Sequence, residues 1–455
     1  MYSLKTIFIS AVVILACLFA VYGVYKRYFS MTAKLDRYVQ TYVDLNLFSG
    51  VILVAKDGKI ILCKAYGMAD FELDVPNKID TKFRLGSITK QFTAMAIMQL
   101  QEMGRLNVQD SLLKYIPDYP RGNEITIHNL LTHTSGIPNV TSFPEYSKKK
   151  IKPHTLEQLI QRFKDKPLEF TPGEKYAYSN SNYIVLTYIL EKASGKKYEI
   201  FLKEHIFDPL AMKDTGCDDY GRIIKNRASG YSFVDGELVN AGYIDMSFPV
   251  GAGALYSTVQ DLYRWDRALY TKKLVAQEFL NKIFTPFKET YGYGWFIETS
   301  PYGKVIQHGG GIDGFAAQIS RYVDRNTCII VLSNFESVSV QMVNNLSRIL
   351  FGQKPEYTPK KHAAVVVSPQ IYDQYVGTYK AHKKDSTFVV TKDHDRLFIE
   401  RIEKKDKREV YPETETEFFL KSLDVQFSFI KDKNGNVVRL VLHQQGNDIS
   451  FERVK

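Results

Sequence analysis

Ser87 and Lys90 are the residues of this chain whose types and spacing could support nucleophilic catalysis. They follow Phe83-Arg84-Leu85-Gly86 and open an apolar run that predicts a largely buried helix ending near Gly104. Positions i and i+3 share one face of a helix, so the hydroxyl would lie above the amine at the positive N-terminal end. Serine becomes a useful nucleophile only when a neighbouring base removes its proton, and an amine held beside it could do so.

The Ser-x-x-Lys spacing is weak evidence when it stands alone. An isolated pair of this kind is more simply interpreted as an N-capping serine followed by a solvated lysine. The helix context distinguishes Ser87, and further motifs are needed to support a catalytic role. The same spacing occurs at Ser111/Lys114, Ser147/Lys150, Ser194/Lys197 and Ser428/Lys431.

Two short motifs later in the chain could supply partners for Ser87. Tyr178-Ser179-Asn180 is the one Tyr-x-Asn of the sequence, and it lies in a turn-rich approach to a predicted helix. His308-Gly309-Gly310 is the one His-x-Gly, and it follows a predicted strand whose glycine run continues to Gly311. Taken singly, the first would be an ordinary turn and the second a loop with an exposed imidazole.

Ser-x-x-Lys, Tyr-x-Asn and His-x-Gly in this order resemble the motifs of the serine β-lactamase and penicillin-recognising superfamily. The most similar branch contains class C β-lactamases, D-alanyl-D-alanine carboxypeptidases and related esterases. The resemblance extends over about residues 34–352. Other stretches that carry it are residues 130–136, which contain His133 and are interpreted as structural, residues 251–253 and residues 291–295.

The resemblance implies a role for each residue of the first two motifs. Ser87 would be the acylated nucleophile, and Lys90 would hold positive charge beside it and shuttle its proton. Tyr178 would face Ser87 as a phenolate or a hydrogen-bonded phenol, with Lys90 and His308 as candidate cationic neighbours. Asn180 would bind the substrate carbonyl and fix Lys90. Whether Lys90 or Tyr178 takes the serine proton is left open.

The third motif would supply the substrate-binding strand edge through His308, Gly310 and Gly311. The backbone N–H groups of Ser87 and Gly311 would form the oxyanion hole. This motif has histidine where many β-lactamases have lysine, and Gly309 where they have threonine or serine. Imidazole is largely neutral at pH 7, and the missing hydroxyl removes a donor for a substrate carboxylate. Acyl esters or amides that lack this carboxylate are therefore favoured over tightly bound β-lactams.

The elements that must position these residues indicate an α/β (α+β) fold. Two apolar runs joined by Asp57-Gly58 predict a hairpin before the Ser87 helix, and strands return at about residues 293–332. This order predicts one antiparallel sheet, built from both ends of the domain and flanked by helices, beside an α-helical lobe. The active site would lie between the two.

Short strands after residue 370 predict a small antiparallel β-barrel. Its Tyr375-Val376-Gly377-Thr378-Tyr379 resembles the lipocalin-like modules attached to such enzymes. The expected domains are an anchor or signal segment at 1–30, a serine hydrolase domain at 31–355, a linker at 356–369 and a lipocalin-like domain at 370–455.

Composition excludes several other classes of function. The chain has 455 residues, a net charge of +10 and four cysteines that form no Cys-x-x-Cys pair. The basic residues are mostly interspersed with acids, which indicates a solvated surface. No metal-ligand spacing and no phosphate-binding loop is present in the sequence, so we expect no metal, no cofactor and no nucleic-acid partner.

The N-terminal segment predicts contact with a membrane. Residues 6–25 are apolar and uncharged, and 20 such residues can span a bilayer. We expect a single-pass anchor with the catalytic domain outside the cytoplasm, although the basic residues after the segment favour the opposite topology. The alternatives are a cleaved signal peptide or a lipid anchor at Cys17.

These observations predict a serine hydrolase that acts on D-alanyl peptides or esters of the bacterial cell wall, with β-lactams as further candidate ligands. One alternative is a β-lactam- or glycan-binding sensor on the same fold without efficient turnover. Another is a general carboxylesterase. The sequence leaves open the natural substrate and the oligomeric state.

Overall fold

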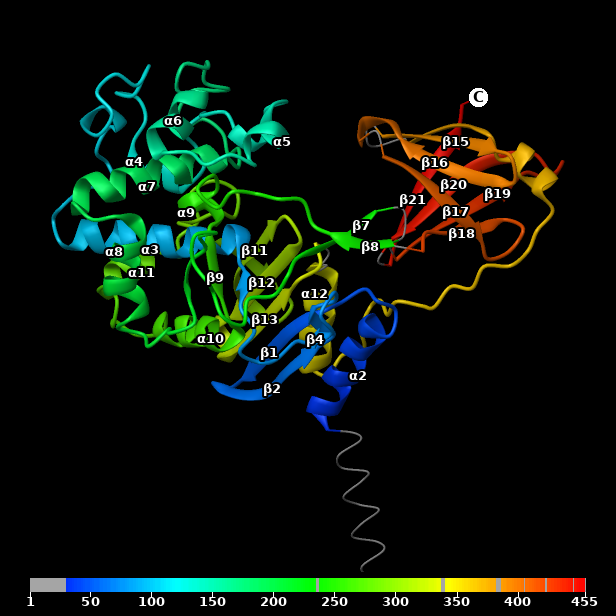
Figure 1. Ribbon diagram of the computed structural model, residues 1–455, viewed down its shortest axis with the longest axis horizontal. Coiled ribbons are helices and arrows are strands. Elements are labelled where there is room, and N and C mark those ends of the chain that lie inside the picture. Colours follow the sequence, from blue (N-terminus) through cyan, green and yellow to red (C-terminus); the bar gives the residue numbers. More distant parts are fainter. Residues whose placement is uncertain are drawn as a thin grey trace, which may run out of the picture.

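The computed structural model describes residues 30–234, 237–336, 340–381, 386–404, 406–421, 424–444 and 446–454. It consists of a mixed α/β part and a C-terminal barrel (Figure 1). The strands of the first part are β1 (Gly50–Lys56), β2 (Lys59–Tyr66), β3 (Met68–Asp70), β4 (Val75–Pro76), β5 (Phe83–Arg84), β6 (Gly216–Cys217), β7 (Tyr231–Val234), β8 (Glu237–Asn240), β9 (Leu255–Ser257), β10 (Phe296–Ser300), β11 (Gly303–Ile312), β12 (Phe315–Tyr322) and β13 (Thr327–Ser333).

Some helices of the first part begin or end where the sequence supplies a cap. Thr126 and Thr155 each form a capping box with the residue three positions later, and Gly195 ends its helix with φ +71°. The α-helices are α2 (Met31–Val43), α3 (Thr89–Glu102), α4 (Ile127–Leu131), α5 (Tyr146–Lys149), α6 (Leu156–Lys164), α7 (Asn180–Ser194), α8 (Tyr198–Leu202), α9 (Val250–Gly253), α10 (Val259–Ala268), α11 (Gln277–Ile283) and α12 (Val340–Leu350), and the turn that contains Ser87 is the short 3-10 helix η1 (Gly86–Ile88).

The central sheet joins the two ends of the α/β part. Its strand order is β10-β11-β12-β13-β1-β2, and every neighbouring pair is antiparallel. The β1–β2 hairpin turns through Asp57 and Gly58, which both have positive φ, as the Asp-Gly signal predicts. Strand β13 pairs with β1 from Gly50↔Ser333 onward, so segments almost 280 residues apart in sequence lie side by side.

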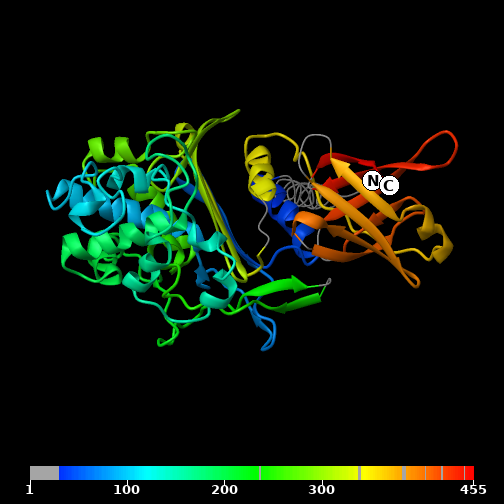
Figure 2. The same ribbon diagram turned by 90° about the horizontal axis from the view of Figure 1, so that it is seen from above.

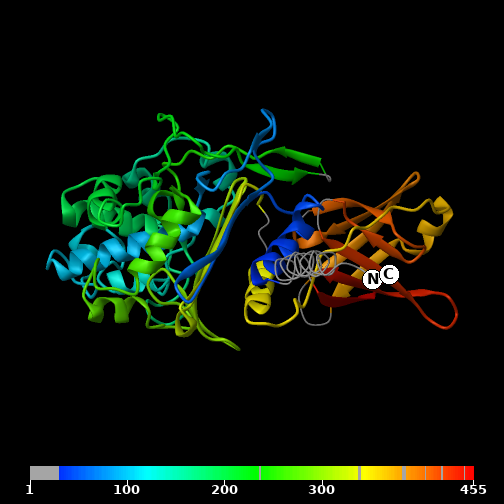
Figure 3. The same ribbon diagram turned by 90° about the horizontal axis from the view of Figure 1, so that it is seen from below.

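Both faces of the sheet are covered. Along β1, Val51 and Leu53 face the large core that contains α3, whereas Ile52 and Val54 face a smaller core formed with α2 and α12. This alternation follows from the period of two along a strand. Seen from above and below, α2 and α12 lie between the sheet and the barrel, and the remaining α-helices lie on the other side (Figures 2 and 3).

The C-terminal barrel is closed by eight antiparallel strands, and aromatic side chains such as Tyr379, Phe418 and Phe429 fill its interior. It connects to the first part at Tyr357, whose carbonyl accepts a hydrogen bond from Tyr38 (3.2 Å) and whose hydroxyl donates to Asp424. Its strands are β14 (Gly377–Ala381), β15 (Thr387–Asp393), β16 (Arg396–Arg401), β17 (Asp406–Pro412), β18 (Glu417–Phe419), β19 (Val425–Lys431), β20 (Val437–Gln444) and β21 (Asn447–Arg453).

The predicted fold class is confirmed: an antiparallel sheet flanked by helices, a helical lobe and a C-terminal antiparallel barrel. The boundaries of the four expected segments stay a prediction. The expected membrane location needs a correction. Residues 6–25 lie outside the described residues, and within the described ranges no helix is both long and apolar enough to cross a bilayer. The structure therefore gives no support to a single-pass membrane protein, and that expectation is withdrawn.

Candidate active site

Ser87 lies in a tight turn that two glycines bring against strand β11. Gly86 has φ +51°, and a Cβ atom added there would lie 2.8 Å from the backbone nitrogen of Gly311. A Cβ atom on Gly310 would lie 1.9 Å from the carbonyl oxygen of Leu85. Only glycine permits this close approach of two backbones. The turn and the strand edge are therefore in direct contact, with Ser87 beside Gly311.

Lys90 is fully buried one turn after Ser87, at the start of α3. Its Nζ lies 3.0 Å from the Ser87 Oγ, 2.8 Å from the Asn180 Oδ1 and 2.8 Å from the Ala252 carbonyl oxygen. Burial holds the pKa of the amine well below its usual value. The predicted neighbourhood of Ser87, Lys90 and Asn180 is present, and the Ala252 carbonyl completes it.

The partners of Lys90 restrict how its protons can be arranged. The Asn180 Oδ1 and the Ala252 carbonyl oxygen can only accept hydrogen bonds, whereas the Ser87 hydroxyl can also donate. A neutral amine has two N–H bonds, which these two oxygens accept. Its lone pair is then directed at the Ser87 hydroxyl, in the arrangement that a base needs to remove the serine proton.

The Asn180 amide is held in one orientation at the first residue of α7. Its Nδ2 donates to the Thr141 Oγ1 (3.2 Å) and the Asn139 Oδ1 (3.4 Å), and its backbone N–H donates to the same Asn139 oxygen (3.0 Å). The Oδ1 atom is therefore the one that faces Lys90. Sequence reasoning missed Asn139, Thr141 and Ala252; of these, only Ala252 fell within a stretch carrying the family resemblance.

The Tyr178 ring also lies beside Lys90, whose Nζ is 4.8 Å from the centre of the phenol ring. Burial raises the pKa of Tyr178 above its usual value, and the interaction with the Ser87 hydroxyl opposes only part of this shift. The phenol therefore stays protonated at neutral pH. Of the two sequence-based possibilities for Tyr178, a protonated phenol fits this environment better than the phenolate. Its buried hydroxyl has no hydrogen-bond partner within the described part of the chain.

His133 packs against the Tyr178 ring and binds the backbone on both sides of it. Its carbonyl oxygen accepts the Ala177 N–H (2.9 Å), its Nδ1 accepts the Ser179 N–H (3.2 Å), and its ring centre lies 4.3 Å from that of Tyr178. The side chain is completely buried and the backbone has φ +55°. Sequence reasoning gave His133 only a structural role in its own turn, because nothing local shows which ring packs on it.

His308 is buried and both of its ring nitrogens have partners. The Nδ1 lies 2.6 Å from the Gly309 carbonyl oxygen, so it carries the proton, and the Nε2 lies 3.1 Å from the Tyr291 hydroxyl and accepts from it. Burial, together with the charge of Lys90, lowers the pKa of His308 to about 3. The imidazole is therefore neutral and does not act as a cationic neighbour of Tyr178.

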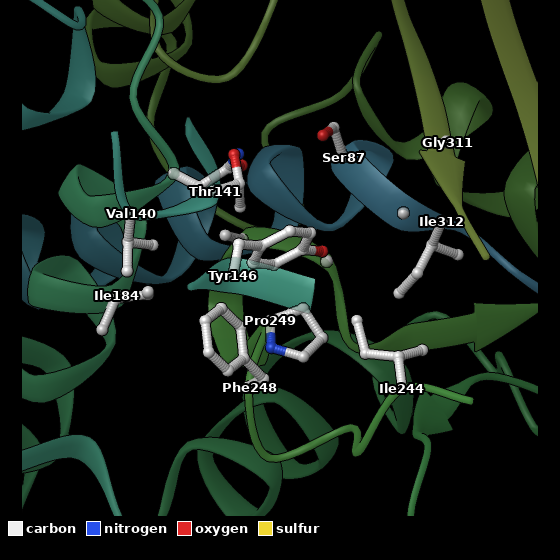
Figure 4. A pocket seen from close by; sticks show the side chains of 14 residues that line it. Ser87, Val140, Thr141, Tyr146, Ile184, Ile244, Phe248, Pro249, Gly311 and Ile312 are labelled. Carbon is white, nitrogen blue, oxygen red and sulfur yellow. The ribbon is translucent and has the colours of Figure 1, made fainter. Parts of the chain in front are cut away.

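A cavity of about 330 Å³ opens in front of Ser87 (Figure 4). Ser87, Asn180 and Gly311 line it, whereas Lys90, Tyr178 and His308 do not, and Gly310 packs against the turn that contains Ser87. Within the described part of the chain, no group of three His, Cys, Asp or Glu side chains could hold a metal ion. The other residues that line the cavity are Gly86, Val140, Thr141, Tyr146, Ile184, Ile244, Phe248, Pro249, Ala252, Gly253 and Ile312.

The lowered pKa of His308 predicts a loss of stability in acid. Because the folded pKa lies below the unfolded value of about 6.5, His308 contributes stability above pH 6.5 that is lost as the pH falls towards 3. This contribution falls by about 1.4 kcal/mol for each pH unit in that window. Urea unfolding followed by the fluorescence of Trp265 and Trp295, at pH 7.5 and pH 5, should show a smaller loss in His308→Gln than in the unaltered protein. Equal losses of unfolding free energy in the two proteins would contradict the lowered pKa of His308.

Comparison with known proteins identifies the family of this chain. Residues 35–350 match the Beta-lactamase family, and residues 361–453 match a domain of unknown function, DUF3471. Penicillin-binding protein 4* of Bacillus subtilis is 31% identical over 447 residues, which cover 91% of this chain and 97% of that protein. The teichoic acid D-alanine hydrolase of Staphylococcus aureus is 26% identical, covering 71% of this chain and 79% of that protein.

Among solved structures, the octameric penicillin-binding protein homologue from Pyrococcus abyssi has a TM-score of 0.65 and 25% identity, covering 92% of this chain and 99% of that one. The family match extends over more than half of the chain, and the relative in Bacillus subtilis extends over both of its parts. The chain therefore belongs to the Beta-lactamase family of serine hydrolases.

Proposed function

We propose that the protein hydrolyses D-alanyl esters or amides of bacterial cell-wall material through an acyl-enzyme on Ser87. The observation that carries this proposal is the buried Lys90 amine, 3.0 Å from the Ser87 Oγ with its other two contacts on atoms that can only accept. The names of the relatives support the substrate class, since one is a penicillin-binding protein and another a teichoic acid D-alanine hydrolase.

Acylation would begin when the neutral amine of Lys90 takes the Ser87 proton. The Oγ then bonds to the substrate carbonyl carbon, and the carbonyl oxygen becomes an oxyanion beside the backbone N–H groups of Ser87 and Gly311. The new ammonium has three N–H bonds for three oxygens, because the Ser87 oxygen has become an acceptor. The Lys90 side chain would thus act as the base before proton transfer and, as an ammonium, as the counter-ion of the oxyanion afterwards.

The second half of the reaction would release the leaving group and then the acid. Protonated Tyr178 can give its proton to the leaving oxygen or nitrogen as the bond to the acyl carbon breaks, and it can recover one from the Lys90 ammonium. Water then attacks the ester on Ser87 with Lys90 again as base. The raised pKa of Tyr178 suits this donor role better than that of a phenolate base.

The surroundings of His308 favour esters and amides without a carboxylate over β-lactams. A cation or a hydroxyl at the third motif would hold the carboxylate of a penicillin or a peptide C-terminus. Here the imidazole is neutral, and the following residue is Gly309. The third motif therefore offers neither a cation nor a side-chain hydroxyl to bind a substrate carboxylate.

Replacement of Ser87 tests the nucleophile directly. We expect Ser87→Ala to reduce ester hydrolysis by about 10³-fold or more. Intact-mass spectrometry after incubation with penicillin or a D-alanyl ester should show an adduct on the unaltered protein and none on Ser87→Ala. Ser194→Ala is the matched control, because Ser194 has the same spacing to a lysine on an exposed helix end. An adduct on Ser87→Ala in the same yield as on the unaltered protein would contradict the proposal.

The lowered pKa of Lys90 predicts the pH dependence of the rate. Because the base must be neutral, kcat/KM should rise with pH through the pKa of Lys90, at a value well below 10.5. Lys90→Arg should abolish this rise together with most of the activity, since guanidinium stays protonated. The profile is measured from pH 5 to 10 with a neutral ester. A rate that falls as the pH rises would contradict Lys90 as the base.

Substitutions at His133 separate its two contacts with the Tyr178 segment. His133→Asn keeps an acceptor for the Ser179 N–H and tolerates φ +55°, whereas His133→Phe keeps a ring but loses the acceptor. If the acceptor positions Tyr178, kcat should fall by less than about tenfold in His133→Asn and by more in His133→Phe, with KM little changed. Thermal unfolding of both variants controls for general damage. The reverse order, at equal stability, would exclude this role.

A further inference from the structure

A second cavity, of about 270 Å³, adjoins the one in front of Ser87. Ile244 and Ile312 line the first cavity and pack in one small cluster. Their neighbours in sequence, Tyr243 and Asp313, line the second cavity, so the two cavities adjoin each other along both of these segments. The residues that line the second cavity are Arg84, Tyr220, Arg227, Ala228, Ser229, Gly230, Asn240, Ala241, Gly242, Tyr243, Asp313 and Phe315.

Arg84 connects the second cavity to the turn that contains Ser87. It is the last residue of β5 and lies three residues before Ser87 in the sequence. A stretch of this length spans at most about 11 Å between the two Cα atoms. A group bound at Arg84 could therefore belong to the same small molecule as the carbonyl that Ser87 attacks.

Two guanidinium groups share one buried carboxylate beside this cavity. The Arg84 Nε donates to the Asp218 Oδ2 (2.7 Å), and the Arg227 Nη1 donates to the Asp218 Oδ1. The side chain of Asp218 is completely buried, whereas those of Arg84 and Arg227 are 7% and 25% exposed. Asp218 balances the charge of one arginine, so one positive charge is left in excess.

The two guanidinium groups also have donors to spare. The Arg84 Nη2 donates to the Tyr220 hydroxyl (2.9 Å). Within the described part of the chain, the Arg84 Nη1 and the Nε and Nη2 of Arg227 make no hydrogen bond. A guanidinium offers five N–H bonds in a rigid fork, which matches the oxygens of a carboxylate or a phosphate. The second cavity thus has both the charge and the donors to hold an oxyanion.

The acidic group on the wall of the second cavity does not cancel this charge. Asp313 is the one acid among the described residues that line it. Its carboxylate accepts a hydrogen bond from the Lys150 ammonium, and the two side chains are only 15% and 17% exposed. Because this pair is neutral as a whole, the excess charge of Arg84 and Arg227 remains.

We propose that Arg84 and Arg227 bind an oxyanion, either a phosphate or a carboxylate, that is carried by the leaving alcohol of the substrate. This inference rests on the proposed function and deepens it. The acyl group of a D-alanyl ester has an ammonium and no anion, so the anion has to belong to the alcohol. Recognition of an anion then falls to these two arginines and not to the third motif.

Three D-alanyl esters that differ at the far end of the alcohol test this assignment. The alcohols are 1-butanol, which is neutral, 3-hydroxypropyl phosphate and 4-hydroxybutanoate, and the release of D-alanine by the full chain is followed at pH 7. We expect kcat/KM to be at least about tenfold higher for one or both anionic esters than for the butyl ester, because hydrogen bonds between charged groups are strong. Comparison of the phosphate with the carboxylate identifies the anion.

Arginine variants make the test specific to this cavity. Arg227→Gln leaves Asp218 paired with Arg84 and should reduce the preference for the anionic ester to less than about threefold. Arg222→Gln is the matched control, because Arg222 binds Glu199 (2.8 Å) and does not line the second cavity. Its preference should stay that of the unaltered protein.

Thermal unfolding of both variants checks that the fold is kept. Arg227→Lys is a second variant for the case that Arg227→Gln is destabilised. Lysine keeps a cation near Asp218 but lacks the fork of donors, so an intermediate preference is expected.

Equal kcat/KM for the three esters overturns the inference, and so does an unchanged preference in Arg227→Gln. An equal loss in Arg222→Gln also overturns it, because the preference would then come from the basic protein as a whole. Hydrolysis of the butyl ester that is lost in Ser87→Ala shows that the proposed function stands in each of these cases. Hydrolysis of none of the esters, or equal hydrolysis by Ser87→Ala, overturns the proposed function together with the inference.

Discussion

The Lys90 amine lies in a completely buried position, and much of the catalytic part is arranged around it. Burial disfavours the ammonium form, and three oxygen neighbours then decide where the remaining protons lie. Those neighbours come from three separate elements: the turn that contains Ser87, the first residue of α7 and the α9 segment. A displacement of any one of them would change the protonation of Lys90 as well as its distance from Ser87.

The need to hold hydrogen-bond acceptors around the Lys90 amine also explains two close contacts farther from Ser87. Gly251 comes within contact of Thr187, where a Cβ atom would lie 2.2 Å from the threonine Oγ1, and this places the next carbonyl, that of Ala252, on Lys90. Asn139 holds the amide of Asn180 so that its oxygen faces the same amine. Around the Lys90 amine, the structure has fixed acceptors where a looser site would have water.

Much of this architecture follows from sequence. The hairpin at Asp57-Gly58, the buried helix after Ser87 and the barrel strands were predicted from local periodicity and turn residues, and Ser87, Lys90 and Asn180 meet as their motifs indicate. The contributions of His133 and the Ala252 carbonyl were not predictable in this way, because each depends on a tertiary contact. The neutrality of His308 is of the same kind, since it results from burial beside Tyr291.

The pairing of β13 with β1 bears on when the enzyme can first work. Ser87 lies early in the chain, but the strand that carries Gly311 is held in the sheet through β12 and β13, whose partner is β1. Contacts this distant in sequence form slowly and late. A growing chain on the ribosome therefore contains Ser87 long before Gly311 is held beside it. Catalytic competence should appear only once about three quarters of the polypeptide has been synthesised.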